Sequence, residues 1–423
     1  MSDQLVAALD DQAAGVVTHL GNGRLRFEYD DAYRVLSAAT PLSVAMPTTV
    51  RAHSDRVITP WLGGLLPEDP EVVASWARRF HVSRAPFALL GTQIGMDCAG
   101  AFRFLDASRA DQALGQRGRV EWLSERDIAA LLRDLVQDTT SWLGRTFTGQ
   151  FSLAGAQAKR ALLYRNGRWV SPTGAIPTSH ILKPAIRGFR DHELNEHLCL
   201  DAAGRAGLLV ARTRVQRFGD QSAIVVERFD RRIVDGQLRR VHQEDVCQAL
   251  AKRPAQKYQQ HGGPSPREIA QLLRRVMPPS AAADAVARFV DALIWNWIVG
   301  GTDAHAKNYS LLLSADQVRL APLYDIASAL PYRHERDLRL AMRLGADYRM
   351  RPQRDPWPAV ARELRVDAEA TVERVRALLN SAPDAFSDAA KARDVVALRR
   401  PLPDRLVDLV TSRSTSCLRL IGG

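Results

Sequence analysis

The sequence predicts an α+β protein with a small N-terminal unit, a strand-rich lobe and a helical lobe. Strand and turn signals dominate residues 1–106 and return in residues 124–240, whereas residues 241–423 show mostly helical spacing. Residues 107–123 have little apolar periodicity and are the expected linker. A chain of 423 residues is also too long for one ordinary core, so two or three domains are expected.

In the N-terminal unit, a hairpin is expected around Asn22-Gly23, the preferred residue pair of a two-residue turn. The segment LRFEY that follows alternates apolar with polar residues, as a half-buried strand does. A helix should begin near Pro70, after the turn in PWLGGLLPED. These elements make the unit a small α+β subdomain.

The strand-rich lobe should begin with a helix, because Ser124 and Asp127 form a capping-box pattern. Hairpins are expected in ALLYRNGRWVSP and RVQRFGDQSAIVVE, each with a glycine-containing turn. Between them lie a short strand, HILKP, and a helix, HELNEHLCLDAAGRAG. The lobe is therefore predicted as a sheet with one internal helix.

Composition excludes some classes of protein and leaves others open. Lys and Arg number 58 against 47 Asp and Glu, a formal net charge of +11, which suits contact with nucleic acid or phosphorylated ligands. An Arg-rich proteome would explain the same charge equally well. The four cysteines are far apart, which disfavours a zinc ribbon or a disulfide framework and favours a reducing cytoplasm.

Membrane association is not expected. The N-terminus MSDQLVAALDDQ lacks the basic start and apolar core of a signal peptide. The most apolar segment, FVDALIWNWIVGG, carries Asp291 and Asn296 and is short for a membrane span. We interpret it as a buried core helix.

The polar loop after this helix, in GGTDAHAKNYSLLL, predicts phosphoryl transfer. Asp303 and Asn308 have the spacing of the kinase catalytic loop, in which four residues separate a catalytic Asp from a metal-binding Asn. A predicted hairpin then leads to Asp325, where kinases place a second metal-binding Asp. Each carboxylate alone is better explained as a turn or helix cap, but the combination favours catalysis.

A kinase also needs a strand lysine and a helix carboxylate that orients it. Lys183 ends the strand HILKP, and the next helix offers Glu193 and Glu196. Glu196 is the preferred partner because it lies deeper in the helix. Taken alone, Lys183 would be an ordinary strand-end lysine.

The small-residue segment GQFSLAGAQAK before that strand is a weak phosphate-loop candidate. Gly155 and its neighbouring alanines would permit close approach of backbone N–H groups to phosphate, and Lys159 could add a charge. The segment matches neither common glycine-rich phosphate motif, and a plain hairpin turn is the alternative. Ser152 is expected here as an exposed hydroxyl.

Other chemistry is less well supported. Glu227 to Phe229, where a buried strand exits, would be the adenine-contacting hinge of a two-lobed kinase, or only a strand leading into a turn. His192 and His197 are five residues apart and do not share a helix face well, so a transition-metal site is disfavoured.

Taken together, these segments resemble the HipA-type serine/threonine kinase toxins of bacterial type II toxin–antitoxin systems. The resemblance covers nearly the whole chain. Its motifs are LGNGRLRFEYDD, PLSVAMP, GLLPEDPEV, SLAGAQAK, HILKP, NEHLCL, VERFDR, HQEDVCQAL, KYQQHGGPS, GGTDAHAKNYSLLL and LAPLYDIAS. It implies a two-lobed protein-kinase-like fold, with ATP and Mg²⁺ as cofactors.

The resemblance also implies a role for each matching residue. Asp303 would be the catalytic base, Asn308 and Asp325 would hold magnesium, and Lys183 would contact the ATP phosphates. Ser152 matches the family's autophosphorylated serine, whose modification ejects the loop and disables ATP binding. The remaining nucleotide-site residues would be Ala154, Gly155, Ala156, Gln157, Ala158 and Lys159 in the phosphate loop, Glu227, Arg228 and Phe229 in the hinge, and His305 and Tyr324 beside the nucleotide. Ala158 departs from the family pattern because it lacks a carboxylate.

The resemblance further implies a small helix-turn-helix antitoxin as partner, operator DNA bound through the complex, and a translation component such as an aminoacyl-tRNA synthetase as substrate. One alternative is a corepressor that increases the antitoxin's affinity for DNA and has little kinase activity. A small-molecule kinase of related fold is a weaker alternative.

Overall fold

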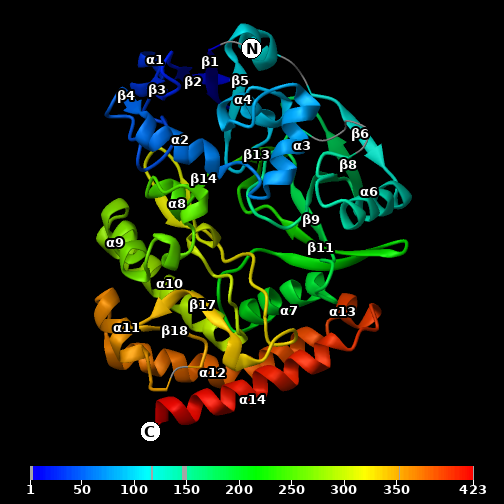
Figure 1. Cartoon of the computed structure of the whole chain (residues 1–423), viewed down its shortest axis with the longest axis vertical. Coiled ribbons are helices and arrows are strands. Elements are labelled where there is room, and N and C mark those ends of the chain that lie inside the picture. Colours follow the sequence, from blue (N-terminus) through cyan, green and yellow to red (C-terminus); the bar gives the residue numbers. More distant parts are fainter. Residues whose placement is uncertain (1–2, 116–117, 145–149, 352, 423) are drawn as a thin grey trace.

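The computed structural model describes residues 3–115, 118–144, 150–351 and 353–422. The chain runs from a blue and cyan N-terminal unit at one end, through a green strand-rich lobe, to a yellow and red helical lobe at the other (Figure 1). The predicted α+β organisation is confirmed.

The N-terminal unit is built on a five-stranded antiparallel sheet of order β4-β3-β2-β1-β5. Gly23 has a φ of +79°, which the predicted turn at Asn22-Gly23 needs, and the hairpin is confirmed. The helix predicted near Pro70 is also confirmed, with Asp69 capping it. The elements are β1 Gln4–Leu9, β2 Gln12–His19, β3 Leu25–Tyr29, α1 Asp31–Arg34, β4 Ala52–Ser54, α2 Asp55–Gly64, α3 Pro70–Phe80, α4 Pro86–Leu90, η1 Gln93–Met96 and β5 Phe102–Asp106.

The expected linker has more structure than its sequence suggests. It contains η2 Ala107–Arg109, α5 Ala110–Gly115 and β6 Val120–Leu123. Strand β6 pairs antiparallel with β8 Arg168–Pro172 and forms one edge of the next sheet. The last four residues of the expected linker therefore belong to the strand-rich lobe by hydrogen bonding.

The strand-rich lobe holds a six-stranded antiparallel sheet of order β10-β11-β9-β7-β8-β6. Asn166 and Gly167 both have positive φ, 52° and 75°, as a type I′ turn requires, and the predicted hairpin is confirmed. Ser124 and Asp127 form the predicted capping box. The remaining elements are α6 Glu125–Gln137, β7 Arg160–Arg165, β9 His180–Pro184, α7 His192–Arg205, β10 Thr213–Phe218, β11 Gln221–Glu227, β12 Arg231–Val234 and β13 Gln237–Arg240.

The helical lobe packs around α10, which is buried along most of its length because it is apolar on nearly every face. A three-stranded sheet, β14-β15-β16, contacts α10 through β16 and carries the predicted hairpin before Asp325. The elements are β14 His242–Asp245, α8 Val246–Ala249, η3 Pro254–Gln256, η4 Gln259–His261, α9 Pro266–Val276, α10 Pro279–Val299, η5 Ala306–Asn308, β15 Ser310–Leu313, β16 Val318–Leu320, η6 Glu335–Asp337, β17 Arg339–Leu344, β18 Asp347–Arg349, α11 Trp357–Leu364, α12 Ala368–Ala390, α13 Arg393–Ala397 and α14 Leu402–Gly422. Among the residues that the structure describes, none of the helices has the length and apolarity to cross a membrane.

Two large apolar cores cut across the expected domain boundaries. One core joins the N-terminal sheet to the strand-rich lobe, with members from Leu5 to Val225. The other gathers the helical lobe but also includes Leu194 and Leu198 of α7. The division at residue 240 stays a prediction, since the cores place α7 with the helical lobe and the N-terminal unit with the strand-rich lobe.

Candidate active site

The segment after α10 is held in one shape by backbone geometry and by its own hydrogen bonds. Gly300 ends the helix with a φ of +70°, and a Cβ on Gly301 would lie 2.4 Å from Asn296 Oδ1. Asn308 Nδ2 donates to the carbonyl of Asp303 at 2.8 Å, and the N–H of His305 donates to the same carbonyl. Asp303 and Asn308 are thereby held at the two ends of one short loop.

The side chain of Asp303 points outward, with 64% of it exposed, and it has one close hydroxyl partner. The phenol of Tyr258 donates to Asp303 Oδ1, and His305 Nε2 lies 3.9 Å from the same oxygen. Burial raises the pKa of Tyr258, and the charges of Asp303, Glu68 and Asp325 raise it further. Tyr258 is therefore a neutral donor positioned on the predicted base. No role was predicted for it, although it belongs to the motif KYQQHGGPS.

Lys183 lies between two carboxylates, one from α7 and one from the segment after β16. Its Nζ is 2.7 Å from Glu196 Oε1 and 2.6 Å from Asp325 Oδ1. Glu193 instead accepts a hydrogen bond from Ser222 Oγ at 2.6 Å. The structure thus pairs Lys183 with the glutamate that was preferred as its partner, because Glu196 faces the sheet from one helical turn deeper.

The charges of Lys183, Glu196 and Asp325, which we call the catalytic group after their predicted role, depend on one another. Burial alone would lower the pKa of Lys183, but Asp325 and Glu196 raise it above its usual value. Burial would likewise raise the pKa of Asp325, yet Lys183 and Lys159 hold it well below its usual range. For Glu196 burial dominates and raises the pKa. Lys183 and Asp325 therefore stay charged at neutral pH.

Asp325 has a φ of +58°, an uncommon conformation for a residue other than glycine. Two contacts hold the residues before it. Leu323 pairs with Val210 as a parallel β-bridge, and the hydroxyl of Tyr324 donates to the Lys307 carbonyl at 2.7 Å. Asp325 and Asn308 line the same small cavity beside Tyr324. The structure therefore brings together the two predicted magnesium ligands.

This donor set fits magnesium. A carboxylate and an amide oxygen are hard ligands, and Mg²⁺ usually combines one or two such groups with phosphate oxygens and water. Within the described part of the chain, no group of three or more His, Cys, Asp or Glu side chains is arranged to hold a metal ion. A Mg²⁺ ion here would depend on Asn308 and Asp325 together with nucleotide phosphates.

The predicted phosphate loop lies closed over its own lysine. Gly155 has a φ of +108°, and Lys159 Nζ donates to the carbonyl of Ala154 at 2.6 Å. Gln157 Nε2 reaches the carbonyl of Pro184 at 3.3 Å, which ties the loop to the end of β9. Burial and the nearby Lys183 lower the pKa of Lys159 to about 8. Ala158, the departure from the family pattern, is buried.

The expectation that Ser152 is exposed is wrong. Its hydroxyl is fully buried and donates to the carbonyl of Leu65 at 2.9 Å, while its N–H donates to the carbonyl of Asp97 at 3.0 Å. Both partners come from the N-terminal unit. Its burial therefore depends on contacts between segments far apart in the sequence, which no local pattern indicates.

The predicted hinge leaves the end of β11 beside the predicted nucleotide residues. The ring of Phe229 lies 5.3 Å from that of Tyr324, and the side chain of Arg228 turns away into the protein interior. The N–H groups of Glu227 and Arg228 donate to the carbonyls of Arg212 and Ser179.

His305 is buried, with its ring 5.0 Å from that of Tyr258. Burial lowers the pKa of His305. This residue is therefore a neutral imidazole beside Asp303 at neutral pH.

A second ionic group near the loop was not predicted. Glu68, from the N-terminal unit, pairs with Lys257 at 2.6 Å and lies 3.9 Å from Lys307. The N–H of Glu68 also donates to the carbonyl of Gly155 at 3.1 Å. The only sequence signal for it is its place in the motif GLLPEDPEV. The N-terminal unit thus contacts both the predicted phosphate loop and Lys307 of the loop between Asp303 and Asn308.

Comparison with known proteins identifies the family. Residues 5–105 match the HipA N-terminal domain, and residues 151–386 match the HipA-like C-terminal domain. The chain is 34% identical to Y4mE of Sinorhizobium fredii over 90% of this chain and 93% of that protein. It is 28% identical to the serine/threonine-protein kinase toxin HipA of Shewanella oneidensis over 73% of this chain and 71% of that protein.

A solved structure shows the same fold. It is that of Shewanella oneidensis HipA in complex with HipB and operator DNA, and it superposes with a TM-score of 0.82 at 22% identity. The match covers 99% of this chain and 98% of that one, which confirms the predicted two-lobed fold with its N-terminal unit. The chain belongs to the HipA family of serine/threonine-protein kinase toxins.

Proposed function

We propose that this protein is an ATP- and Mg²⁺-dependent serine/threonine protein kinase that acts as the toxin of a toxin–antitoxin pair. The observation that carries the proposal is the catalytic group. Lys183 is held between Glu196 and Asp325, and Asp325 shares a cavity with Asn308 of the Asp303 loop. This is the lysine, carboxylate and metal-ligand set that phosphoryl transfer by kinases requires.

Each residue then has one task. Asp303, exposed and positioned by Tyr258, accepts the proton of the attacking substrate hydroxyl. Asn308 and Asp325 hold Mg²⁺, which neutralises charge on the phosphates when it is bound. Lys183 contacts the phosphates, and Glu196 keeps it in place.

The nucleotide would lie between the phosphate loop and the hinge. Residues 154–159 would offer backbone N–H groups and the Lys159 ammonium to the phosphates, once Lys159 releases the Ala154 carbonyl. At the hinge, the N–H of Phe229 is the proposed adenine contact, because those of Glu227 and Arg228 are bonded within the protein. His305 and Tyr324 would complete the site around the nucleotide.

We further propose that the kinase inactivates itself by phosphorylating Ser152. The hydroxyl must first leave the Leu65 carbonyl. A phosphate group adds about −1.5 to −2 charges at pH 7, and a fully buried site beside backbone carbonyls disfavours that charge. The modified loop would therefore stay outside the buried site of Ser152 and would no longer cover the nucleotide.

The partner and target are proposed from the family. The solved relative is bound to HipB and operator DNA, which supports a small helix-turn-helix antitoxin as partner and operator DNA bound through the complex. A translation component such as an aminoacyl-tRNA synthetase is the proposed substrate, with the cytoplasm as the site of action. The net charge of +11 suits either nucleic acid or a tRNA-bound target.

The test is incubation of the purified protein with Mg²⁺ and γ-labelled ATP, followed by mass mapping of phosphopeptides. We expect label on Ser152 in the wild type and none in Asp303→Gln. Clear ATP binding with no label, also after adding candidate substrate, would favour the alternative of a corepressor with little kinase activity. Label of equal intensity in Asp303→Gln would show that the base is misassigned.

A further inference from the structure

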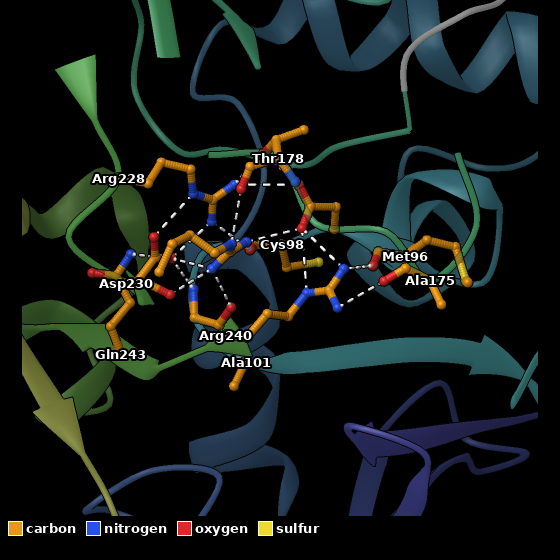
Figure 2. Close-up of polar contacts among 12 residues, drawn as sticks. Met96, Cys98, Ala101, Ala175, Thr178, Arg228, Asp230, Arg240 and Gln243 are labelled. Carbon is orange, nitrogen blue, oxygen red and sulfur yellow. Dashed lines mark hydrogen bonds and ion pairs between the residues drawn. The ribbon is translucent and has the colours of Figure 1, made fainter. Parts of the chain in front are cut away.

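A second buried ionic network lies outside the catalytic site, where the N-terminal unit meets the strand-rich lobe. It consists of Asp97, Arg228, Asp230, Arg231 and Arg240, and we call it the arginine cluster. Figure 2 shows Arg228 and Arg240 converging with Asp230 and Thr178 on the backbone around Cys98. None of these side chains has a role in the proposed chemistry.

Asp97 is at the centre of the arginine cluster. Its Oδ1 accepts from Arg231 at 2.9 Å and from Arg240 at 3.2 Å. Its Oδ2 accepts from Thr178 Oγ1 at 2.6 Å and lies 3.3 Å from Arg228 Nη1. Burial alone would raise the pKa of Asp97, but the three arginines lower it. This carboxylate is ionised and fully bonded.

Through Asp97, the N-terminal unit holds the middle residue of the proposed hinge. Arg228 makes a bidentate pair with Asp230, at 2.9 and 2.7 Å, and also donates to the Cys98 carbonyl at 2.9 Å. A guanidinium with this many fixed partners has one orientation, and so has the backbone that carries it. The next residue, Phe229, carries the N–H that is proposed to meet adenine.

The same short segment also holds Ser152. The carbonyl of Asp97 accepts the N–H of Ser152 at 3.0 Å, and Cys98 pairs with Ser152 as a parallel β-bridge. Two adjacent residues of the N-terminal unit therefore contact both the hinge arginine and Ser152, which lies two residues before the phosphate loop. A displacement of either one changes the bonds of this shared segment.

We propose that Asp97 is a positioning residue that couples the adenine-binding hinge to the phosphate loop. The inference rests on the proposed function, since it uses the hinge and the loop as defined there. Filling the adenine site stabilises the position of Arg228. Because Arg228 is bonded to Asp97 and Cys98, it stabilises these two residues as well, and through them the buried position of Ser152. Because coupling between two sites is reciprocal, release of Ser152 weakens adenine binding to the same extent.

Adenosine tests the coupling, because it can occupy an adenine site but has no phosphate to touch the loop. Amide hydrogen exchange of the peptide spanning residues 150–159, measured in the full-length protein, reports how often the Ser152 segment leaves its buried position. We expect saturating adenosine, confirmed by calorimetry, to slow this exchange about fivefold or more, the usual range of allosteric coupling.

Three variants locate the path. Asp97→Asn and Arg228→Lys should lose most of the protection and bind adenosine more weakly. Arg240→Gln is the matched control, because it removes one cation from Asp97 but contacts neither Arg228 nor Ser152. It should keep the protection. If Asp97→Asn does not fold, Arg228→Lys makes the same comparison.

Each outcome decides a separate point. Adenosine that binds the wild type without slowing exchange overturns the coupling and leaves the proposed function intact. Full protection in both Asp97→Asn and Arg228→Lys overturns the role of the arginine cluster. Adenosine that does not bind the wild type at all overturns the hinge as an adenine site, and the coupling with it.

Discussion

The catalytic group and the arginine cluster are both buried ionic networks, but they differ in how completely their atoms are bonded. Both carboxylate oxygens of Asp97 and of Asp230 accept hydrogen bonds. In the catalytic group, Glu196 Oε2 is buried without a hydrogen-bond partner among the described residues, and 38% of the Asp325 side chain is exposed. A saturated network holds parts of the protein together, whereas an unsaturated one keeps bonding capacity for a ligand.

The difference follows from where each network lies. The arginine cluster joins backbone segments of two units, so its arginines also donate to carbonyls such as those of Cys98 and Gly100. The catalytic group lies beside the loop that carries Asp303, and among the described residues its central cation has only carboxylate partners. Half-satisfied buried polar groups are costly, and each one in a folded protein needs an explanation, of which a bound ligand is one.

The largest expected effect is on activity at the exposed carboxylate. Asp303→Gln should reduce phosphoryl transfer about 10²- to 10⁴-fold, because the substrate hydroxyl loses its base. Stability should not change, since the side chain is mostly exposed and its hydroxyl partner can bond the amide. Label transfer from ATP and the midpoint of thermal unfolding measure the two. A lower midpoint of thermal unfolding together with lost activity would mean that Asp303 stabilises the fold.

Replacing one cation in each network should affect stability in the arginine cluster and activity in the catalytic group. Arg228→Met should cost about 3–5 kcal/mol of stability, because it removes one partner of a fully buried set. Lys183→Met should cost less, since Asp325 can turn toward solvent, yet it should abolish phosphoryl transfer. Chemical unfolding compares the two variants. A larger stability loss for Lys183→Met would reverse the distinction drawn between the networks.

Glu244 sharpens the comparison because its donors carry no charge. It accepts from the N–H of Val44 at 2.8 Å and from Trp61 Nε1 at 3.0 Å, and burial raises its pKa from the ordinary 4.5 to about 7. Between those pH values the folded protein keeps a proton that the unfolded chain releases. Stability should therefore fall as pH rises from about 4.5 to 7 and level off above 7, by about 3 kcal/mol in total.

The control for this pH effect is Glu244→Gln, which does not titrate. Thermal unfolding of the wild type and the variant is measured at pH 5 and pH 8. The stability of the variant relative to the wild type should be higher at pH 8 than at pH 5. An equal shift of both proteins would assign the pH dependence to other groups.

The smallest effect is expected at Tyr258. Tyr258→Phe removes the hydroxyl that donates to Asp303 but keeps the ring beside His305. We expect kcat to fall about three- to tenfold, which corresponds to about 0.6–1.4 kcal/mol, the range of an ordinary hydrogen bond. Steady-state kinetics with a protein substrate measure it, with unchanged KM for ATP as the matching expectation. A loss as large as that of Asp303→Gln would make Tyr258 part of the proton transfer itself.

The sequence by itself determined the local elements and the catalytic spacing. The turns at Asn22-Gly23 and Asn166-Gly167 follow from residues that tolerate positive φ, and the helix at Ser124 from its capping box. The order of lobes and the spacing of Asp303 and Asn308 are equally local, and the choice of Glu196 over Glu193 needed only depth within one helix. Several nucleotide-site residues were predicted through family resemblance, because their motifs are individually weak.

Only the tertiary structure decided which distant segments share contacts. These contacts join residues 45 to 189 positions apart: the burial of Ser152 against Leu65 and Asp97, the pairing of Glu68 with Lys257, the hydroxyl of Tyr258 on Asp303, and the bonds of Asp97 to the arginines of the cluster. The two cores also ignore the boundaries that composition suggests. Turn and cap preferences act within a few residues, whereas burial and ion pairing depend on which surfaces meet after the chain has folded.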